Sequence, residues 1–255
     1  MTSPTGRHAL VTGASRGIGR AIAQSLSADG AHVTLLVRNR LAGESVQSEL
    51  PGSSHVVEAD VTDEAAVHRA CADATSDFGP VHILVNNAGS VETASFAKSD
   101  DALFRKMLAV HLFGPLYCTQ ALLPEMVDAK FGRVINIAST AGVSGAAYIS
   151  AYCAAKHALV GLTRSLAKEV VTRGVTVNAI CPGYTQTDML STSIQRISAR
   201  TGITGEAAAS ALLQHNPLHR FISPDEVAAA VVWLSSDGAA SVTGQTIIID
   251  GGELA

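Results

Sequence analysis

Seven short runs of β-branched and aliphatic residues recur along the chain, and longer segments with helical periodicity separate them. The runs are almost continuously apolar, as is typical of strands in a parallel sheet that is buried on both faces. They cover residues 8–12, 32–37, 55–59, 81–85, 133–137, 175–180 and 246–249. Strands that alternate with helices predict βαβ units with right-handed crossovers. The sequence therefore predicts an α/β fold: a doubly wound, seven-stranded parallel sheet with helices on both faces.

The segments between these runs carry helix signals. One begins at Gly17, has an apolar face, and ends before Gly30, which is a good C-cap. Another follows Asp63, an N-cap residue with Glu64 in the first turn. The predicted helices cover residues 17–29, 63–77, 101–129, 150–173 and 224–236.

No linker, charge block or low-complexity tract divides the chain, so we expect a single domain over residues 1–255. The stretch from about 188 to 222 breaks the alternation of strands and helices between the sixth and seventh strands. A long insertion beyond the carboxyl ends of the strands is where a substrate lid would lie. We therefore expect a lid over residues 188–222.

The charge balance argues against several classes of partner. The formal net charge is −4, and charged residues make up 16% of the chain against roughly 25% in an ordinary soluble domain. An acidic balance argues against nucleic-acid binding, and the sequence has no polybasic segment to hold an anionic membrane. The low charged fraction leaves apolar surface that association into a homo-oligomer would cover.

Three further features favour an enzyme of the cytoplasm. The longest uninterrupted apolar run, 227–234, is far shorter than the ~20 residues of a membrane span. Residues 1–6 lack the apolar core of a signal peptide. The cysteines are scattered and predict buried free thiols, with no metal site and no disulfide; they are Cys71, Cys118, Cys153 and Cys181.

A glycine-rich turn directly follows the first predicted strand and opens the first predicted helix. After Thr12 it reads Gly13, Ala14, Ser15, Arg16, Gly17, Ile18 and Gly19. Gly13 permits a tight turn, Gly17 lets backbone approach a pyrophosphate, and Gly19 allows close packing of the helix on the sheet. The position of this turn between strand and helix predicts a Rossmann-like, dinucleotide-binding fold rather than a plain structural turn.

The second predicted strand ends without the acidic residue that usually binds the ribose 2′-hydroxyl of NAD. Arg38 stands there instead, and Arg16 lies in the glycine-rich turn. A guanidinium can form a bidentate contact with a 2′-phosphate, so the sequence favours NADP(H), with NAD(H) as the alternative. After the third strand, Asp60 and Val61 are placed to accept from the adenine amino group and to pack on the ring.

Tyr152 and Lys156 stand four residues apart in a predicted helix, which puts the phenol and the ammonium on one helical face. A free tyrosine has a pKa of about 10, and an adjacent cation favours the phenolate and lowers that pKa. Ser139 follows the fifth predicted strand, at the edge of the sheet where ligands bind. Together these three residues predict an acid/base site.

Along nearly its whole length, the sequence resembles the short-chain dehydrogenase/reductase family. The matching elements, in order, are Thr12–Gly19, Asp60-Val61, Asn86-Asn87-Ala88-Gly89, Ser139, Tyr152 with Lys156, Pro182-Gly183 with Thr187, and Asp250-Gly251-Gly252. The resemblance implies that the protein interconverts a ketone and a secondary alcohol, with a nicotinamide cofactor carrying the hydride. It also implies a homotetramer that makes contacts through the fourth and fifth helices and the last strand.

The resemblance also implies roles for individual residues. Tyr152 would be the acid/base on the alcohol or ketone oxygen, Ser139 would hydrogen-bond that oxygen, and Lys156 would lower the tyrosine pKa and bind the nicotinamide ribose. The residues implied to line the adenosine side of the cofactor are Asn86, Ala88 and Gly89. Those implied to orient the nicotinamide are Pro182, Gly183 and Thr187.

Two positions depart from the family pattern. In the fourth helix the family usually has an asparagine that supports a water-mediated proton path to the lysine, and this sequence has His111. His111 is either a packed helical histidine or a residue that keeps a polar link to Lys156 and adds pH dependence to catalysis. At Thr185 the family tends to have an aliphatic residue, which affects only an expected backbone contact with the cofactor.

The residues expected to face the substrate, in a mostly apolar pocket, are Val91, Val143, Tyr148, Ile149 and Tyr184. Basic residues in the lid would suit a CoA or carrier-protein thioester, but exposed helix charges explain them equally well. The stretches around Ser139 and Tyr152 look like those of bacterial 3-oxoacyl and polyketide ketoreductases, and also like those of hydroxyacyl-CoA and secondary-alcohol dehydrogenases. A non-catalytic dinucleotide-binding subunit is the alternative of another class.

Overall fold

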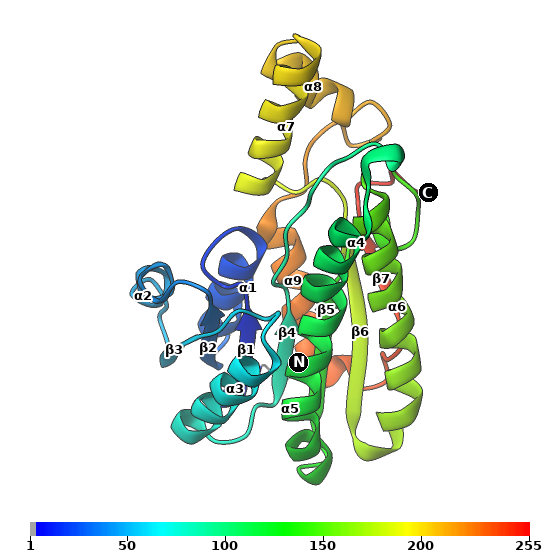
Figure 1. Cartoon of the computed structure of the whole chain (residues 1–255). Helices are drawn as coiled ribbons and strands as arrows, with labels where there is room; N and C mark the ends of the chain where they lie inside the picture. Colours follow the sequence, from blue (N-terminus) through cyan, green and yellow to red (C-terminus); the bar gives the residue numbers. More distant parts are fainter. Residues whose placement is uncertain (1–3) are drawn as a thin grey trace.

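The fold is built on one parallel sheet, described by a computed structural model that covers residues 4–255. The strand order is β3-β2-β1-β4-β5-β6-β7 (Figure 1). The strands are β1 (His8–Thr12), β2 (His32–Val37), β3 (Ser54–Glu58), β4 (Ile83–Asn86), β5 (Gly132–Ile137), β6 (Val175–Pro182) and β7 (Thr246–Ile249). All neighbouring strands are parallel, which confirms the predicted doubly wound sheet.

Helices cover both faces of this sheet (Figure 1). They are α1 (Gly17–Ala28), α2 (Arg40–Gln47), α3 (Glu64–Phe78), α4 (Asp101–Leu108), α5 (Gly114–Asp128), α6 (Ser150–Val170), α7 (Asp188–Thr201), α8 (Gly205–Leu212) and α9 (Pro224–Ser235). Side chains alternate along β1, so Ala9 and Val11 join the core under α1 and α9. Leu10 joins the core on the opposite face, under α3 and α5.

The region predicted as one helix over 101–129 contains a break. A π-helical turn, η2 (Ala109–Phe113), joins α4 to α5. Such turns insert one extra residue per turn and often lie at functional sites. The helical periodicity of the sequence hides this turn, because the apolar pattern continues on both sides of it.

Helix α2 was not predicted, and the predicted lid region contains α7 and α8. α2 is only eight residues long and begins after Asn39, whose side chain accepts from Ala42 N at 3.0 Å. A short helix with few buried residues leaves little periodic signal in the sequence. The other strands and helices lie within three residues of their predicted bounds, as is usual for boundaries read from a pattern.

Residues 101–128 form a helical run that is long and apolar enough, by length and composition, to cross a membrane. Within the described part of the chain, Cys118 and Leu122 of this run are buried in the core on one face of the sheet, and Met107 is buried against α6. A buried core helix meets the same criterion of length and composition. Residues 1–3, which belong to the segment expected to lack a signal peptide, lie outside the described residues.

The sheet extends on both sides of β1. β2 and β3 extend the sheet on one side of β1, whereas β4 and the strands after it extend the other side. In open α/β sheets the crevice at such a switch point, outside the carboxyl ends of the strands, is where ligands bind. The fold therefore places the turn after β1 and the turn after β4 at the two sides of one crevice.

A chain of hydrogen bonds between buried side chains, two amides and a hydroxyl, connects this crevice to α6. Asn86 and Asn136 are register partners on β4 and β5. The Asn86 amide donates to Asn136 Oδ1 at 2.9 Å, and the Asn136 amide donates to Thr163 Oγ1 at 2.9 Å. Thr163 lies on α6, so this chain fixes the helix that carries Tyr152 and Lys156 against the two strands.

Replacing the central amide tests this connection. Asn136→Ala removes the partners of two buried polar groups and leaves a small cavity, so we expect the free energy of unfolding to fall by about 2–3 kcal/mol. Urea denaturation followed by circular dichroism measures the loss. The matched control is Gln120→Ala on the exposed face of α5, for which we expect a change below about 0.5 kcal/mol. Similar midpoints for the two variants would contradict the role of the buried chain.

Candidate active site

A cleft of about 460 Å³ lies at the switch point of the sheet. It brings together most of the predicted cofactor residues: Gly13, Ser15, Arg16, Gly17, Ile18, Gly19, Arg38, Asp60, Val61, Ala88, Gly89, Tyr152, Lys156 and Thr187. His111 also lines this cleft. Residues that are far apart in the sequence thus share one surface, as a dinucleotide site requires.

The glycine-rich turn fits tightly against the turn after β4. A Cβ on Gly13 would lie 2.8 Å from Ala88 Cα, and one on Gly19 would lie 2.4 Å from both the Asn87 amide nitrogen and the Gly13 oxygen. Thr12 Oγ1 accepts from the backbone N–H groups of Asn87 and Ala88 at 2.9 and 3.0 Å. Only glycine at these two positions allows such a close approach.

The N-terminus of α1 opens into this cleft with free donors. Its N-cap residue, Arg16, makes no side-chain capping bond, and the first turn contains no acidic residue. The first N–H groups of a helix carry partial positive charge and lack intrahelical partners. A pyrophosphate would satisfy them, so the geometry and donor set fit a dinucleotide.

Arg38 and Asp60 face each other across the far end of the cleft. Arg38 Nη1 lies 4.0 Å from Asp60 Oδ2, and both side chains are largely exposed. Asp60 Oδ1 accepts from the backbone and hydroxyl of Thr62 at 2.9 and 2.8 Å, which fixes its carboxylate. An exposed guanidinium with a distant partner is free to bind a phosphate group.

Tyr152 and Lys156 lie on the same face of α6, as the spacing predicts. Lys156 Nζ is 5.7 Å from the centre of the Tyr152 ring and donates to the Ile137 carbonyl at 2.7 Å. The Tyr152 hydroxyl shares a hydrogen bond with Ser139. Ser139 begins the short helix η3 (Thr140–Gly142), and its hydroxyl also accepts from Ala141 N at 3.1 Å.

Burial shifts the pKa values of Tyr152 and Lys156 more strongly than neighbouring charges do. Burial raises the pKa of Tyr152 to about 12, and the Ser139 hydrogen bond opposes that rise. Burial also lowers the pKa of Lys156 to about 8. In this structure burial is the largest influence on the Tyr152 pKa, and the lowering of that pKa by Lys156 stays a prediction. The phenol is held neutral, which is the form of a proton donor.

His111 occupies the π-helical turn and points toward Tyr152. The two rings meet edge to face, with centroids 5.0 Å apart. His111 Nε2 is 2.7 Å from the Ser90 carbonyl oxygen, so this nitrogen carries the proton, and the buried Nδ1 has no partner among the described residues. Burial, with repulsion from Lys156, lowers the pKa of His111 to about 3.

Five predicted residues do not line this cleft. Asn86 lies beneath it in the buried amide chain, whereas its neighbour Asn87 lines the cleft and donates to the Thr12 and Gly13 oxygens. Ser139 reaches the site through its bond to Tyr152. Pro182 ends β6, and Gly183 and Thr185 follow it. The Thr185 hydroxyl donates to the Gly183 oxygen at 3.0 Å.

The predicted substrate residues also lie outside the lining of this cleft: Val91, Val143, Tyr148, Ile149 and Tyr184. Tyr148 and Tyr184 are exposed, and Tyr148 has a positive φ of 67°. The Tyr148 carbonyl accepts from Ala94 N at 2.9 Å, which joins the two loops that carry these residues. A left-handed tyrosine is uncommon and often marks a functional loop.

Sequence reasoning missed several lining residues: Leu36, Val37, Asn39, Ala42, Ala59, Asn87, Ser90, Val110, Ile137, Ala138, Asp188 and Met189. Most of them are direct neighbours of predicted residues. Asn87 had a signal, because it stands inside the Asn86–Gly89 element. Ala42 had none, because its position depends on the unpredicted helix α2.

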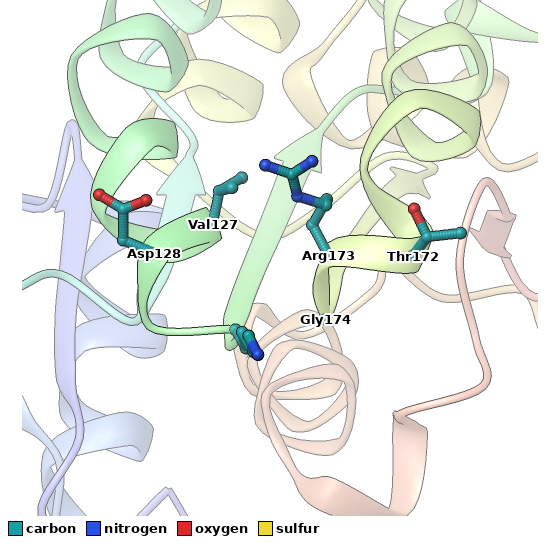
Figure 2. Close-up of a pocket in the computed structure, with 6 residues that line it drawn as sticks. Val127, Asp128, Thr172, Arg173 and Gly174 are labelled. Atoms are coloured by element: carbon teal, nitrogen blue, oxygen red, sulfur yellow. The ribbon is translucent and has the colours of Figure 1, made fainter.

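A second cavity, of about 510 Å³, lies at the amino ends of β5 and β6, away from the cleft (Figure 2). It is lined by the end of α5 and by η4 (Val171–Arg173), through Val127, Asp128, Lys130, Thr172, Arg173 and Gly174. Both helices end here with partial negative charge, and the side chains carry both signs. This mixture gives no ligand class a clear advantage.

Comparison with known proteins agrees with this geometry. Residues 7–197 match the family model of short chain dehydrogenases. The 3-oxoacyl-(acyl-carrier-protein) reductase of Haemophilus influenzae is 35% identical over 247 residues, covering 97% of this chain and 98% of that protein. The D-beta-hydroxybutyrate dehydrogenase of Cupriavidus necator is 36% identical over 256 residues, covering 98% of both.

A solved structure agrees as well. A variant of actinorhodin polyketide ketoreductase, crystallised with NADPH, has a TM-score of 0.92 at 33% identity, with 97% of each chain covered. The fold and the oxidoreductase class expected from the sequence are confirmed. This chain belongs to the short chain dehydrogenase family.

Proposed function

We propose that the protein reduces the ketone of a 3-oxoacyl thioester or polyketide-type substrate to a secondary alcohol with NADPH. The observation that carries this proposal is the joint placement of Ser139, Tyr152 and Lys156 beside a cleft that fits a dinucleotide. The similarity to a 3-oxoacyl reductase and to a polyketide ketoreductase supports the substrate class. A dinucleotide-binding subunit without catalysis would not need these three residues together.

The three side chains suit proton transfer to a ketone oxygen. The neutral Tyr152 phenol donates its proton to the oxygen as negative charge develops there, and Ser139 donates a second hydrogen bond to the same oxygen. Lys156 stabilises the phenolate that remains and binds the nicotinamide ribose. When bound, the reduced dinucleotide supplies the hydride. In the reductive direction, the neutral phenol is the form that donates the proton.

Removal of the phenolic hydroxyl tests this role. Tyr152→Phe should lower kcat for NADPH oxidation by at least about 100-fold, because the proton donor is lost. The dissociation constant for NADPH should change little. Rates are measured across a panel of 3-oxoacyl thioesters and simple ketones, and Tyr117→Phe on α5 serves as the control with unchanged activity.

The panel also separates the alternatives. A dehydrogenase of hydroxyacyl-CoA or secondary alcohols, which the similarity to D-beta-hydroxybutyrate dehydrogenase favours, would show its highest kcat/KM with NAD and an alcohol. Absence of turnover with every ketone and alcohol in the wild-type protein would leave only the binding-subunit interpretation.

We propose NADP(H) as the preferred dinucleotide and NAD(H) as the weaker one. Arg38 and Arg16 line the cleft at the end of β2 and in the glycine-rich turn, and no acidic residue ends β2. Arg38 would contact the 2′-phosphate, while Asp60 and Val61 would bracket the adenine. Because the backbone of the glycine-rich turn is tightly packed, the dinucleotide preference depends on the arginine side chains rather than on the turn.

Charge reversal at Arg38 tests the preference. Arg38→Asp should shift the ratio of NADPH to NADH affinities by at least about 100-fold toward NADH, because a carboxylate repels the 2′-phosphate and can accept from a 2′-hydroxyl. Fluorescence titration of both reduced dinucleotides measures the ratio. Arg40→Asp, on α2 outside the cleft lining, is the matched control. A wild-type preference for NADH would overturn the assignment.

We propose His111 as a positioning residue for proton supply to Lys156. Its Nδ1 is an acceptor that is buried without a protein partner, and the ring packs against Tyr152 beside Lys156. A water that donates to Nδ1 would lie next to the Lys156 ammonium and continue a path for protons. The Gly89 position leaves room for the ring, since a Cβ there would lie 2.8 Å from His111 Cε1.

Two substitutions separate a polar role from a packing role. His111→Asn should remain active, because an amide oxygen still accepts from water, and its pH–rate profile should shift, because the polar surroundings of Lys156 change. His111→Leu should lose much of its rate, because the acceptor is gone. The measurement is kcat against pH from 5.5 to about 9.5 in wild type and both variants. Three superimposable profiles would assign His111 to packing alone.

We infer that the chain is a single domain whose lid, residues 188–222, covers the substrate. Helices α7 and α8 project from one end of the molecule (Figure 1). The two stems of the lid are joined where Gln186 N donates to Ile222 O and Ile222 N donates to Tyr184 O, each at 2.9 Å. This junction fixes the base of the lid, with the predicted substrate residue Tyr184 at the base, and Asn216 in the lid also donates to the Asp250 carbonyl at 2.8 Å.

We also infer a cytoplasmic homotetramer. Two of the expected contact elements carry exposed apolar side chains: Ile248 on β7 is 45% exposed, and Phe113, directly before α5, is 42% exposed. Association would bury these side chains. The small-molecule substrate and the acidic net charge agree with an enzyme that binds neither nucleic acid nor membrane.

A further inference from the structure

Four histidines line the amino ends of neighbouring strands, at the opposite end of the sheet from the cleft. His8 begins β1, His32 begins β2, His55 lies in β3 and His82 directly precedes β4. His8 and His32 are register partners. Phe78, the last residue of α3, packs on two of them: its ring stacks on His32 at 5.2 Å and meets His8 edge-on at 5.5 Å. We refer to these four side chains as the histidine row.

His8 uses both ring nitrogens inside the protein. Its side chain is buried. Nδ1 lies 2.9 Å from the Gly79 carbonyl oxygen and therefore donates. Nε2 lies 2.8 Å from the buried Thr34 hydroxyl and, in the neutral ring, accepts from it. A second proton on His8 would force the Thr34 hydroxyl to reverse its role and find another acceptor.

His82 has a hydrogen-bond partner that, unlike a hydroxyl, cannot change from donor to acceptor. Its Nδ1 accepts from the His8 backbone N–H at 3.2 Å. A backbone N–H can only donate, so a proton on this nitrogen would remove the hydrogen bond outright. The contact joins the start of β1 to the residue before β4, the same two strands that Thr12 joins at their carboxyl ends.

The surroundings of His82 oppose a further positive charge. The guanidinium groups of Arg7 and Arg133 lie 4.0 and 4.3 Å from the centre of the Phe131 ring, and the His82 ring lies 6.1 Å from it. Arg7 repels a charge on His82. The carboxylates that contact this region serve other groups, since Asp237 pairs with Arg7 and Asp77 contacts His55.

We propose that the His8 backbone and the His82 ring form an acid-sensitive lock between the amino ends of β1 and β4. The bond from the His8 N–H to His82 Nδ1 holds only while the His82 ring is neutral, and it adds to the bond that the His82 N–H donates to the His8 carbonyl at 2.8 Å. Protonation of His82 opens the lock by removing the acceptor of the His8 N–H. The glycine-rich turn lies at the carboxyl end of this same pair of strands. Acid therefore weakens the strand pairing that supports the cleft, although no residue of the cleft itself takes up a proton.

The direction of the pKa shifts agrees with this lock. Burial is the largest cause that lowers the pKa of both His8 and His82; neighbouring histidines add to it at His8, and Arg7 adds to it at His82. Below about pH 6.5 the unfolded chain takes up protons that the folded protein refuses. Stability is therefore complete at neutral pH and is lost as the pH falls below about 6.5. Each such group raises the unfolding equilibrium constant by up to about tenfold per pH unit.

Comparison of variants isolates His82, because the low pKa of His111 adds acid sensitivity of its own. In His82→Asn the amide oxygen takes the place of Nδ1 and still accepts from the His8 N–H, but it does not titrate. Between pH 7.5 and 5.5 the unfolding equilibrium constant of wild type should rise at least about threefold more than that of His82→Asn. Urea titrations at both pH values give the constants.

The matched control is His68→Asn, because His68 is exposed on α3. This variant should keep the wild-type pH dependence, so a loss of acid sensitivity in both variants would show a general effect of histidine removal. The same pH dependence in His82→Asn and wild type would overturn the lock.

A measurement on wild type holds even where His82→Asn folds poorly. Hydrogen exchange of the His8 amide, corrected for the intrinsic effect of pH, should lose protection between pH 7.5 and 5.5, whereas the Val11 amide, near the carboxyl end of β1, should lose less. Equal protection of the His8 amide at both pH values would show that the contact does not depend on a neutral His82.

Discussion

The site depends on one hydroxyl that joins two strands. Thr12 Oγ1 accepts from the N–H groups of Asn87 and Ala88, which brings the turn after β1 against the turn after β4. The strand order reverses beside β1, so these turns meet at the crevice between β1 and β4. The N-terminus of α1 then opens into that crevice with its donors free.

Burial is the second common cause, and it acts on acids and bases in opposite directions. It raises the pKa of Tyr152 and lowers the pKa of Lys156 and His111, so each group moves toward its neutral form. The same cause lowers the pKa of His8 and His82 at the other end of the sheet. A neutral group can be buried in the core without the cost of burying a charge. Because its pKa then differs from that in the unfolded chain, the free energy of unfolding depends on pH. The hydroxyl of Tyr152 becomes a proton donor, and the histidine row becomes a place where acid weakens the fold.

Most of the framework was predictable because its signals are local. Continuous apolar runs gave all seven strands, and the glycine-rich turn placed the dinucleotide cleft. The spacing of Tyr152 and Lys156 put both groups on one face of α6, and the structure keeps them there. Local signals failed where an element is short or where the pattern continues through a break. Helix α2 and the π-helical turn that carries His111 are the two examples.

The finer arrangement of the site was not predictable in the same way. Asn86 and Asn87 are adjacent and chemically identical, yet one is buried in an amide chain and the other lines the cleft. Asn86 is the last residue of β4 and points into the buried side of the sheet, whereas Asn87 begins the turn and faces the cleft. Likewise, charge spacing suggested that Lys156 would control Tyr152, whereas the depth of both groups in the protein matters more.

The amino-acid sequence by itself determined the order of strands and helices, the turn that binds phosphate groups and the residue types of the acid/base set, because periodicity and spacing act over a few neighbouring residues. Only the tertiary structure decided which side chains are deep enough to stay neutral, which amide reaches the cleft and which histidines meet at the far end of the sheet. Those outcomes depend on contacts between residues that are distant in the chain, and no local pattern records them.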